Sequence, residues 1–404
     1  MRLNTRTAAG IDSPIGAAYA LADLREGGGK LIDLAQAAPQ YPPAPVVVER
    51  VAAVARDPRG ATYTDVPGLP ALREAFAAEV SRDYRGVVHA ADVVVTAGCN
   101  QAFSIAVTAL AEPGDEIVLP LPYYFNHDMW LRMTGVRPVY LEPGPDLVPW
   151  AADAEPLITS RTRAIVLITP GNPSGVTVDP DGIAAFAALA RRHGIALLID
   201  ETYRSFRDTA APAHRLFADP DWRDTVVSLH SFSKDLALPG HRVGAVIAAP
   251  RLNREICKLL DCVAICAPRI GQEAVLAGLA HARDWRRERA REVAEQRALF
   301  AEAMARRPGG FELRACGGFF AWVRHPFPDR PTEDVVRDLA VRHDTLVMPG
   351  NAFLPDDRAM IRVSVSNLDR ETTATFAERL ALSAADSRVR ACGNARPVGS
   401  HTRR

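Results

Sequence analysis

The sequence predicts an α/β protein, in which a mainly parallel sheet of seven strands is flanked by helices and joined to a smaller α+β domain. Three observations predict this class. Seven apolar runs rich in β-forming residues lie between residues 93 and 248. Helical stretches separate most of them, and strands that alternate with helices form βαβ units, whose parallel strands are covered on both faces. Beyond residue 251, long helices and short strands indicate the second domain.

The N-terminal part of the chain is predicted to be helical, with one extended crossing segment. Helical spacing covers residues 12–30, which three glycines at 27–29 bring to an end, and it returns at 44–55 and 69–81. Between the first two helices, a short apolar run at 31–34 leads into a proline-rich stretch. Proline cannot continue a helix, so this stretch is expected to be extended.

The predicted sheet follows in seven runs. In chain order they span residues 93–96, 116–119, 137–141, 164–169, 196–199, 225–229 and 243–248. Intervening helices are expected at 101–110, 127–134 and 180–193. In sheets of this kind, ligands bind beyond the carboxyl ends of the strands, so the residues that follow each run are candidates for a site.

Small or polar residues follow four of these runs. They are Gly98, Cys99 and Asn100 after the first run, Asn172 after the fourth, Asp200 and Tyr203 after the fifth, and Ser231 and Lys234 after the sixth. The first group opens a predicted helix, whose free amides can hold a phosphate. The sequence therefore predicts that polar groups converge on one rim of the sheet.

Lys234 is conspicuous because the chain has three lysines, at positions 30, 234 and 258, and carries nearly all its positive charge on arginine. An amine in apolar surroundings loses its proton more easily, and only the neutral amine is a nucleophile towards carbonyl groups. Arginine cannot replace it, because a guanidinium stays charged. The alternative is an ordinary lysine whose stem covers apolar surface while its amine stays in water.

The remainder of the chain is predicted to form the smaller domain. Helices are expected at 269–281, 284–306, 332–343 and 369–384, with short strands at 314–323, 346–348 and 360–365. We predict residues 1–45 as an N-terminal segment of the small domain, 46–285 as the large domain, 286–385 as the small C-terminal domain and 386–404 as a tail. The tail has few apolar residues and several arginines, and we expect it to be disordered.

Composition and charge argue against several classes of function. The 48 Lys and Arg residues balance the 48 Asp and Glu residues, which disfavours a nucleic-acid or anionic-membrane partner. No apolar stretch approaches the roughly twenty residues of a membrane span, and the polar start has no signal core, so a cytoplasmic location is expected. The six cysteines lack C-x-x-C pairing, so we expect neither a metal site nor a disulfide framework.

Four motifs, taken in order, resemble those of a known family. They are Asn172-Pro173-Ser174-Gly175, Asp200-Glu201-Thr202-Tyr203, Ser231-Phe232-Ser233-Lys234 and Arg242. The set resembles class I/II aminotransferases of pyridoxal-phosphate fold type I, and the similarity runs from about Leu31 to the last helix. The S-x-x-K motif also occurs in serine enzymes, but the companion S-D-N and K-T-G motifs are missing. The resemblance implies pyridoxal 5'-phosphate as cofactor and an amino acid and a 2-oxo acid as substrates.

The resemblance implies cofactor roles for the residues on the predicted rim. Lys234 resembles the lysine that forms a Schiff base with the cofactor and later moves a proton. Asp200 resembles the carboxylate that keeps the pyridine nitrogen protonated. Asn172 and Tyr203 resemble the pair that hydrogen-bonds the phenolic oxygen. The phosphate would be held by Ser231, by Arg242 and by the amides of Gly98, Cys99 and Asn100.

The resemblance also implies roles away from this rim. Tyr124, rather than its neighbour Tyr123, resembles the aromatic residue that stacks on the pyridine ring. Tyr63 resembles the tyrosine that reaches the phosphate of a neighbouring subunit, which implies a homodimer with shared sites. Arg362 resembles the arginine that grips the substrate α-carboxylate through its two-pronged guanidinium.

Three positions bear on substrate identity. Ala37 stands where many family members have glycine, and His127 stands where many have tyrosine. Gln36 is a further candidate to face the pocket. Because side-chain recognition depends on such positions, the substrate stays open at this point.

The sequence leaves more than one function open. The first is transamination from an amino acid to a 2-oxo acid through a Lys234 Schiff base. The second is β-elimination, ring closure or oxygen-dependent oxidation, since one fold supports all these chemistries. The third is a regulatory protein that senses a ligand. A regulator would need an attached DNA-binding module, and the segment before Leu31 has neither the length nor the basic helix-turn-helix character for one.

Overall fold

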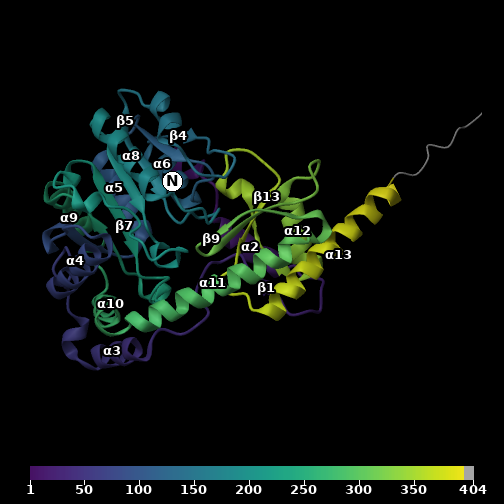
Figure 1. Cartoon of the computed structure of the whole chain (residues 1–404), viewed down its shortest axis with the longest axis horizontal. Coiled ribbons are helices and arrows are strands. Elements are labelled where there is room, and N and C mark those ends of the chain that lie inside the picture. Colours follow the sequence, from purple (N-terminus) through teal and green to yellow (C-terminus); the bar gives the residue numbers. More distant parts are fainter. Residues whose placement is uncertain (395–404) are drawn as a thin grey trace, which may run out of the picture.

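The computed structural model describes residues 1–394, with side chains to residue 387. A seven-stranded sheet lies at the centre of the larger of two parts (Figure 1). Its strands are β2 (Val93–Thr96), β3 (Glu116–Pro120), β4 (Arg137–Leu141), β5 (Thr162–Ile168), β6 (Ala196–Asp200), β7 (Val226–Ser231) and β8 (Gly244–Ile247). They lie in the order β2-β8-β7-β6-β5-β3-β4, and all neighbours run parallel except β8, which is antiparallel to β2 and β7. The predicted fold class is confirmed.

Helices cover both faces of this sheet because successive strand residues point to opposite sides. Val93 and Val95 belong to one hydrophobic cluster and Val94 belongs to the other. The first cluster is completed by α3 (Pro45–Arg56), α4 (Pro70–Tyr84), α8 (Pro180–His193) and α10 (Arg269–His281). The second is completed by α5 (Cys99–Leu110), α6 (Phe125–Thr134) and α9 (Pro250–Ala264).

Each of the seven predicted strands matches an observed strand, with ends that differ by at most two residues. Helix α9 was not predicted, although Leu252, Ile256 and Leu260 recur at every fourth position and pack on the sheet. The helix predicted at 12–30 is shorter than expected, because α2 spans Pro14–Ala22. The chain beyond it is held by Asp344, which accepts hydrogen bonds from Arg25 Nε at 2.7 Å and from Gly29 N at 2.9 Å.

The smaller part contains an antiparallel sheet in the order β12-β13-β10-β9. Its strands are β9 (Glu312–Gly317), β10 (Phe320–Arg324), β12 (Met348–Pro349) and β13 (Met360–Ser364). Helices α12 (Thr332–His343) and α13 (Arg370–Asn394) pack beside it. The N-terminal segment joins this part, since β1 (Ile32–Asp33) pairs in parallel with β11 (Thr345–Leu346), and Ile32 and Leu34 lie in its hydrophobic core.

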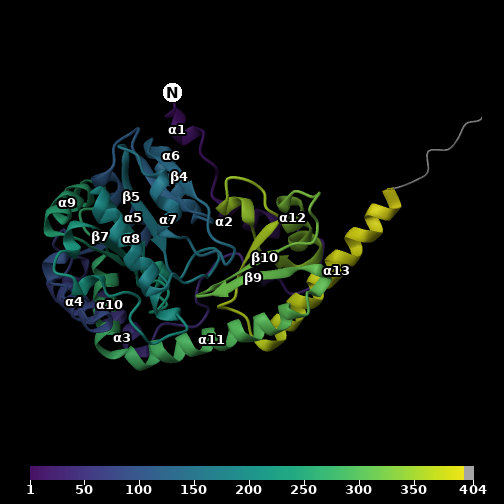
Figure 2. The same cartoon turned by 45° about the horizontal axis from the view of Figure 1, so that its top comes forward.

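The long helix α11 (Arg283–Ala305) runs from the larger part to the smaller one (Figure 2). Trp285, near its start, packs against the core of the larger part, whereas Phe300 and Met304 lie in the core of the smaller part. The proposed boundary at 285/286 therefore falls within the first turn of this helix.

Helix α13 extends to Asn394, which differs from the expectation that residues 386–404 are disordered. An apolar stripe is not needed to continue a helix that is already nucleated, which is why low hydrophobicity misled the prediction. Residues 395–404 lie outside the described part of the chain. Between residues 1 and 394, no helix combines the length and the apolar character needed to cross a membrane. The cytoplasmic location stays a prediction.

Candidate active site

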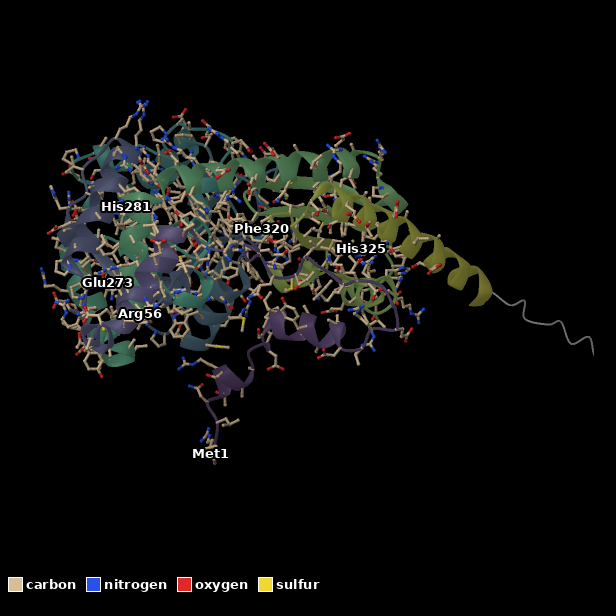
Figure 3. The ribbon with its side chains drawn as sticks, turned by 90° about the horizontal axis from the view of Figure 1, so that it is seen from below. Met1, Arg56, Glu273, His281, Phe320 and His325 are labelled. Carbon is tan, nitrogen blue, oxygen red and sulfur yellow. The ribbon has the colours of Figure 1, made fainter. Side chains whose placement is uncertain are left out.

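The candidate site lies where the carboxyl ends of β5, β6 and β7 face the smaller part. Asp200 is the last residue of β6, and Lys234 follows shortly after β7 ends at Ser231. From the smaller part, Phe320 lies at the junction of the two parts (Figure 3). Its ring centroid is 5.1 Å from that of Tyr203. The structure therefore gathers the predicted rim residues at the junction.

Lys234 points into this junction. Its Nζ donates a hydrogen bond to the carbonyl oxygen of Ala37, and the side chain is partly buried. Burial, followed by the nearby charges of Arg362 and Arg242, lowers the pKa of Lys234 from 10.5 to about 8. A substantial fraction of the amine is therefore neutral near pH 8, as the chemistry of a nucleophile or base requires.

Asp200 is 5% exposed and is surrounded by hydrogen-bond donors. Its carboxylate accepts from Thr202 N at 2.9 Å, and Oδ2 lies 3.5 Å from His127 Nε2. Burial alone would raise the pKa of Asp200, but the hydrogen bonds and charge interaction with His127, together with Thr202, hold it below 3.8. Asp200 therefore keeps a negative charge in a buried place. Such a carboxylate can stabilise a protonated nitrogen on a ligand.

Tyr124 and Tyr123 point to different surroundings. Tyr123 stacks on Tyr140 of β4, with ring centroids 5.5 Å apart. Tyr124 instead makes an edge contact with His127, with centroids 5.3 Å apart, and Asn126 Nδ2 donates to its hydroxyl at 3.0 Å. Burial raises the pKa of Tyr124, a hydrogen bond with Asn100 opposes that effect, and Arg362 and Asp200 act on it as nearby charges. Of the two tyrosines, Tyr124 is thus the one beside the rim residues.

The start of α5 and Arg242 form a cradle. Gly98, the residue before α5, has φ +87°, and a Cβ on it would come 2.3 Å from Arg242 Nη2. A Cβ on Gly244 would lie 2.8 Å from Cys99 N. These close approaches require glycine. Arg242 donates to the carbonyl oxygens of Pro239 at 2.7 Å and Ala97 at 3.4 Å.

This cradle has donors to spare for an anion. Among residues 1–394, Arg242 has no carboxylate partner. The first amides of a helix have no partner within it, and they attract negative charge. Ser231, at the end of β7, has its hydroxyl 3.2 Å from Ser233 N, from which it accepts a hydrogen bond. The donor set is one that suits a phosphate group.

Arg362 lies on β13 and is 2% exposed. Nη1 donates to Asn172 Oδ1 at 3.0 Å, and Nη2 donates to the carbonyl oxygen of Ala35. The guanidinium lies 5.0 Å from the ring centroid of Phe320 and 4.8 Å from that of Phe353. Burial lowers the pKa of Arg362 to about 10.

The guanidinium of Arg362 is not balanced by a carboxylate of the described residues, and its buried Nε has no hydrogen-bond partner there. A buried cation without a counter-charge is costly. A carboxylate on a ligand would supply both the charge and the missing acceptor.

Tyr203 and Ala37 belong to one small hydrophobic cluster with Phe319 and Phe320. Burial raises the pKa of Tyr203 well above 10, and Tyr124 and Arg362 are its next strongest electrostatic neighbours. The hydroxyl of Tyr203 therefore stays protonated and is available as a hydrogen-bond donor in this junction.

Two predicted residues lie apart from this group. Tyr63 is 73% exposed, on a loop held by Arg269, whose Nη2 donates to Tyr63 O at 3.0 Å. Gln36 is exposed, and its Oε1 accepts from the hydroxyl of Tyr19 at 3.3 Å. The side chain of Gln36 is therefore directed to α2, whereas Ala37 reaches Lys234.

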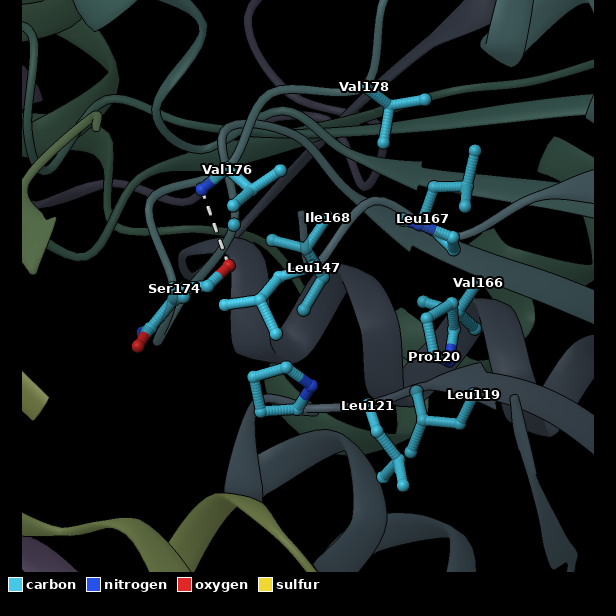
Figure 4. Close-up of a pocket in the computed structure, with 14 residues that line it drawn as sticks. Leu119, Pro120, Leu121, Leu147, Val166, Leu167, Ile168, Ser174, Val176 and Val178 are labelled. Carbon is cyan, nitrogen blue, oxygen red and sulfur yellow. Dashed lines mark hydrogen bonds between the residues drawn. The ribbon is translucent and has the colours of Figure 1, made fainter. Parts of the chain in front are cut away.

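A small cavity of about 40 Å³, part of whose wall is seen in Figure 4, has Asn172 among its lining residues. Its walls are mainly apolar residues of β3, β5 and the loops that follow. Ser174 Oγ accepts from Val176 N at 3.3 Å and closes the loop that carries Asn172. This volume is of the order of a water or two and does not fit a substrate.

Sequence reasoning named His127 only as a departure from the family pattern. The structure places it against Asp200, stacked on Phe103 with centroids 3.8 Å apart. The available signal was its spacing, because His127 comes three positions after Tyr124, the residue that caps the start of α6, and residues three apart face the same side of a helix. A second missed group is formed by Glu79, Arg204, Asp235 and Arg286, of which Arg204 and Asp235 directly follow Tyr203 and Lys234 in the chain.

Two relatives show similarity over most of their length. The chain is 31% identical over 359 residues to the aromatic aminotransferase ISS1 of Arabidopsis thaliana, which covers 86% of this chain and 88% of that protein. It is 30% identical over 329 residues to the arginine–pyruvate transaminase AruH of Pseudomonas aeruginosa. This alignment covers 80% of this chain and 82% of that protein.

Solved structures agree with this similarity. A mutant of the aspartate aminotransferase of Thermus thermophilus has a TM-score of 0.86 with this chain at 25% identity, over 95% of this chain and 100% of that one. Residues 29–380 match the family described as aminotransferase class I and II. This match spans most of the chain, which therefore belongs to the class I and II aminotransferases.

Proposed function

We propose that this aminotransferase binds pyridoxal phosphate covalently through Lys234 and moves an amino group from an amino acid to a 2-oxo acid. One observation carries the proposal. Lys234, an amine with a pKa of about 8, lies within electrostatic reach of Arg242 and Arg362. In the described part of the chain, neither arginine has a carboxylate partner. A cofactor phosphate and a substrate carboxylate are the two anions that these arginines would bind.

The residues present fit the cofactor. When bound, pyridoxal phosphate supplies a carbonyl carbon that an amine can attack and a ring that accepts electrons when Cα loses its proton. The cradle of Arg242, Ser231 and the first amides of α5 would hold its phosphate. Asp200 would hold the proton of its ring nitrogen, and His127 would keep that carboxylate ionised and oriented. Tyr124 would lie against the ring.

Other side chains would orient the substrate and move the proton. Arg362 would bind the α-carboxylate, because its buried guanidinium has an open donor at Nε. Asn172 orients that guanidinium through the 3.0 Å hydrogen bond to Nη1 and, with Tyr203, would donate to the phenolic oxygen of the cofactor. Lys234, freed from Ala37 O, has the pKa of a base that would take the proton from Cα onto Nζ and then deliver it from Nζ to the cofactor carbon.

We further propose that two copies of the chain share their sites. Tyr63 lies on a loop that is held by hydrogen bonds, yet its side chain is 73% exposed. Val263 and Ile265, at the end of α9, are also exposed, at 67% and 39%. Arg269, four residues after Ile265, holds the Tyr63 loop through Thr62 O at 3.1 Å and Tyr63 O at 3.0 Å. Exposed apolar side chains on segments linked in this way are typical of a surface that a second copy covers.

The amino acid substrate is not inferred from the relatives, whose names refer to aromatic, arginine and aspartate substrates. The proposal specifies only the groups that all amino acid substrates share. These are the α-amino group and the α-carboxylate, of which Arg362 would bind the carboxylate.

The test is reconstitution with pyridoxal phosphate. The unmodified protein is expected to show the visible absorbance band of the covalently bound cofactor, and Lys234→Ala is expected to lose that band. A panel of amino acids should then discharge the band in a single turnover, with sustained turnover only when a 2-oxo acid is added. An unchanged band in Lys234→Ala would reject the lysine assignment, and release of ammonia without a 2-oxo acid would instead indicate elimination.

A further inference from the structure

We propose that Arg286, in the first turn of α11, is a positioning residue that holds Lys234 and Tyr203 at their working separation. The inference rests on the proposed function. Arg286 belongs to a largely buried group of four charged residues, here called the α11 charge cluster. Its members are Glu79, Arg204, Asp235 and Arg286.

The hydrogen bonds of the cluster converge on Arg286. Its Nη2 donates to Glu79 Oε2 at 2.6 Å, and its Nη1 is shared between Glu79 Oε1 at 3.1 Å and Asp235 Oδ2 at 3.3 Å. Arg204 Nη2 donates to the same carboxylate, at 2.5 Å from Glu79 Oε1. One guanidinium therefore links two carboxylates, and one of those carboxylates carries the second guanidinium.

The cluster touches the site through the chain itself. Asp235 follows Lys234, and Arg204 follows Tyr203. Consecutive Cα atoms are held about 3.8 Å apart by the peptide bond, so a shift of either charged residue moves the residue before it. Glu79, on α4, and Arg286, on α11, thus fix two loops that follow neighbouring strands of the sheet.

Burial makes this geometry demanding. Glu79 is 3% exposed and Asp235 is 6% exposed. The remaining hydrogen-bond donor to Asp235 in the described chain is Ser205 Oγ, at 3.4 Å, and Asp235 Oδ1 has no partner there. Arg286 is therefore the guanidinium on which Asp235 depends. Buried charges are tolerated only when their partners lie in good geometry.

Helix α11 also supports a third segment of the site. Trp285 makes an edge contact with Tyr41 at 5.7 Å between centroids, and the Arg289 guanidinium lies 5.5 Å from the Tyr41 ring. Tyr41 is four residues after Ala37, whose carbonyl accepts from Lys234. The same helix continues into the core of the smaller part through Phe300. One turn of α11 therefore places three segments of the site relative to each other.

The test replaces the fork of Arg286 while keeping its charge. A lysine cannot donate to Glu79 and Asp235 at once in a fixed plane, so Arg286→Lys should loosen the link between them. We expect kcat to fall about 10- to 100-fold, as for misplacement of reacting groups by about 1 Å, with KM within about threefold of the unmodified protein. The pH at which the absorbance of the bound cofactor titrates should also shift, since that titration senses donors near the ring.

Arg287→Lys is the matched control. Arg287 is the next residue of α11, is exposed, and pairs with Asp284 at 3.4 Å on the surface. It should leave kcat, KM and the absorbance titration unchanged. Asp235→Asn removes the charge attraction between Asp235 and Arg286 by changing the carboxylate instead, and it is expected to give the same fall in kcat. The role of this pair can therefore be tested even if Arg286→Lys does not fold.

Each outcome decides. If Arg286→Lys only lowers the unfolding temperature of the cofactor-free protein, and kcat and the titration per folded molecule match those of Arg287→Lys, the positioning role is wrong. If the unmodified protein binds no pyridoxal phosphate, the proposed function fails and this inference fails with it. A normal absorbance band in the unmodified protein, with a displaced titration and reduced kcat in Arg286→Lys, supports both.

Discussion

Arg204 and Arg362, two arginines with little exposed side-chain surface, differ in one respect. Arg204 bonds Glu79 at 2.5 Å, and interactions with Glu79 raise its pKa against the effect of burial. Arg362 is bonded by neutral oxygens of Asn172 and Ala35, and burial lowers its pKa to about 10. Arg204 is therefore paired with a carboxylate of the protein, whereas Arg362 could pair with a carboxylate of a ligand.

The comparison indicates which buried charges serve the fold and which serve a ligand. A paired buried charge stabilises the fold only as long as both partners remain, because removal of one leaves the other uncompensated. An unpaired buried charge is a cost that binding can offset. The two arginines should therefore respond to mutation in opposite ways.

The largest effect is expected for Arg362→Gln. Loss of a buried charge that pairs with a substrate carboxylate costs about 2 to 5 kcal/mol, so kcat/KM should fall by about 30-fold to several thousand-fold, measured by steady-state kinetics with the best amino acid donor. The unfolding free energy of the cofactor-free protein should stay the same or rise, since the variant removes an uncompensated cation. A loss of stability as large as that of Arg204→Gln would contradict the distinction drawn between the two arginines.

The next effect is the stability of Arg204→Gln. Breaking a buried ion pair typically costs about 3 to 5 kcal/mol, and we expect the lower end because Arg286 continues to bond Glu79. Urea unfolding of the cofactor-free protein measures this. Arg192→Gln, which removes the exposed pair with Glu155, is the control and should change stability by less than about 1 kcal/mol.

A third prediction concerns pH. Folding lowers the pKa of Lys234 from 10.5 to about 8. Below pH 8 the amine is therefore protonated in both the folded and the unfolded chain, and the folded protein carries the full free-energy cost of burying that charge. Between pH 8 and 10.5 the amine is mostly neutral in the folded chain but still protonated in the unfolded chain. The free energy of unfolding therefore rises with pH over this range, and the cost of the buried charge disappears. Lys234→Met should therefore stabilise the cofactor-free protein at pH 7, by about 1 to 2 kcal/mol after solvent screening, and less at pH 10.

Parallel urea titrations of both proteins at pH 7 and pH 10 measure this difference. If the stabilisation by Lys234→Met instead grew with pH, burial would not be destabilising the charged form of the Lys234 amine.

The smallest effect tests the other unpaired arginine, Arg242. Inorganic phosphate should raise the unfolding midpoint of the larger part of the cofactor-free protein by about 2 to 4 °C, which corresponds to about 1 kcal/mol for a domain of about 150 to 250 residues. Arg242→Gln should abolish this shift, whereas Arg204→Gln should retain it, because the guanidinium of Arg204 is already paired. An equal shift in the two variants would indicate that phosphate acts elsewhere on the protein.

The sequence was a good guide where the signal is local. The strands of the larger sheet are apolar runs that read directly from neighbouring residues, and Asp200 and Lys234 come just after two of them. Helix α9 was missed although its apolar residues recur at every fourth position. Gln36 stays a predicted pocket residue, and the sequence did not show that its Oε1 accepts a hydrogen bond from the hydroxyl of Tyr19.

What the sequence by itself determined is the order of strands and helices and the identity of the polar residues at the strand ends. Both follow from patterns within a few residues, and parallel strands bring their carboxyl ends to one edge. Only the tertiary structure decided which charges are partnered. Glu79 lies 125 positions from Arg204, and Asn172 lies 190 positions from Arg362. Whether a buried guanidinium meets a carboxylate or an amide depends on such distant contacts, and this difference in counter-charge separates a structural arginine from one that awaits a ligand.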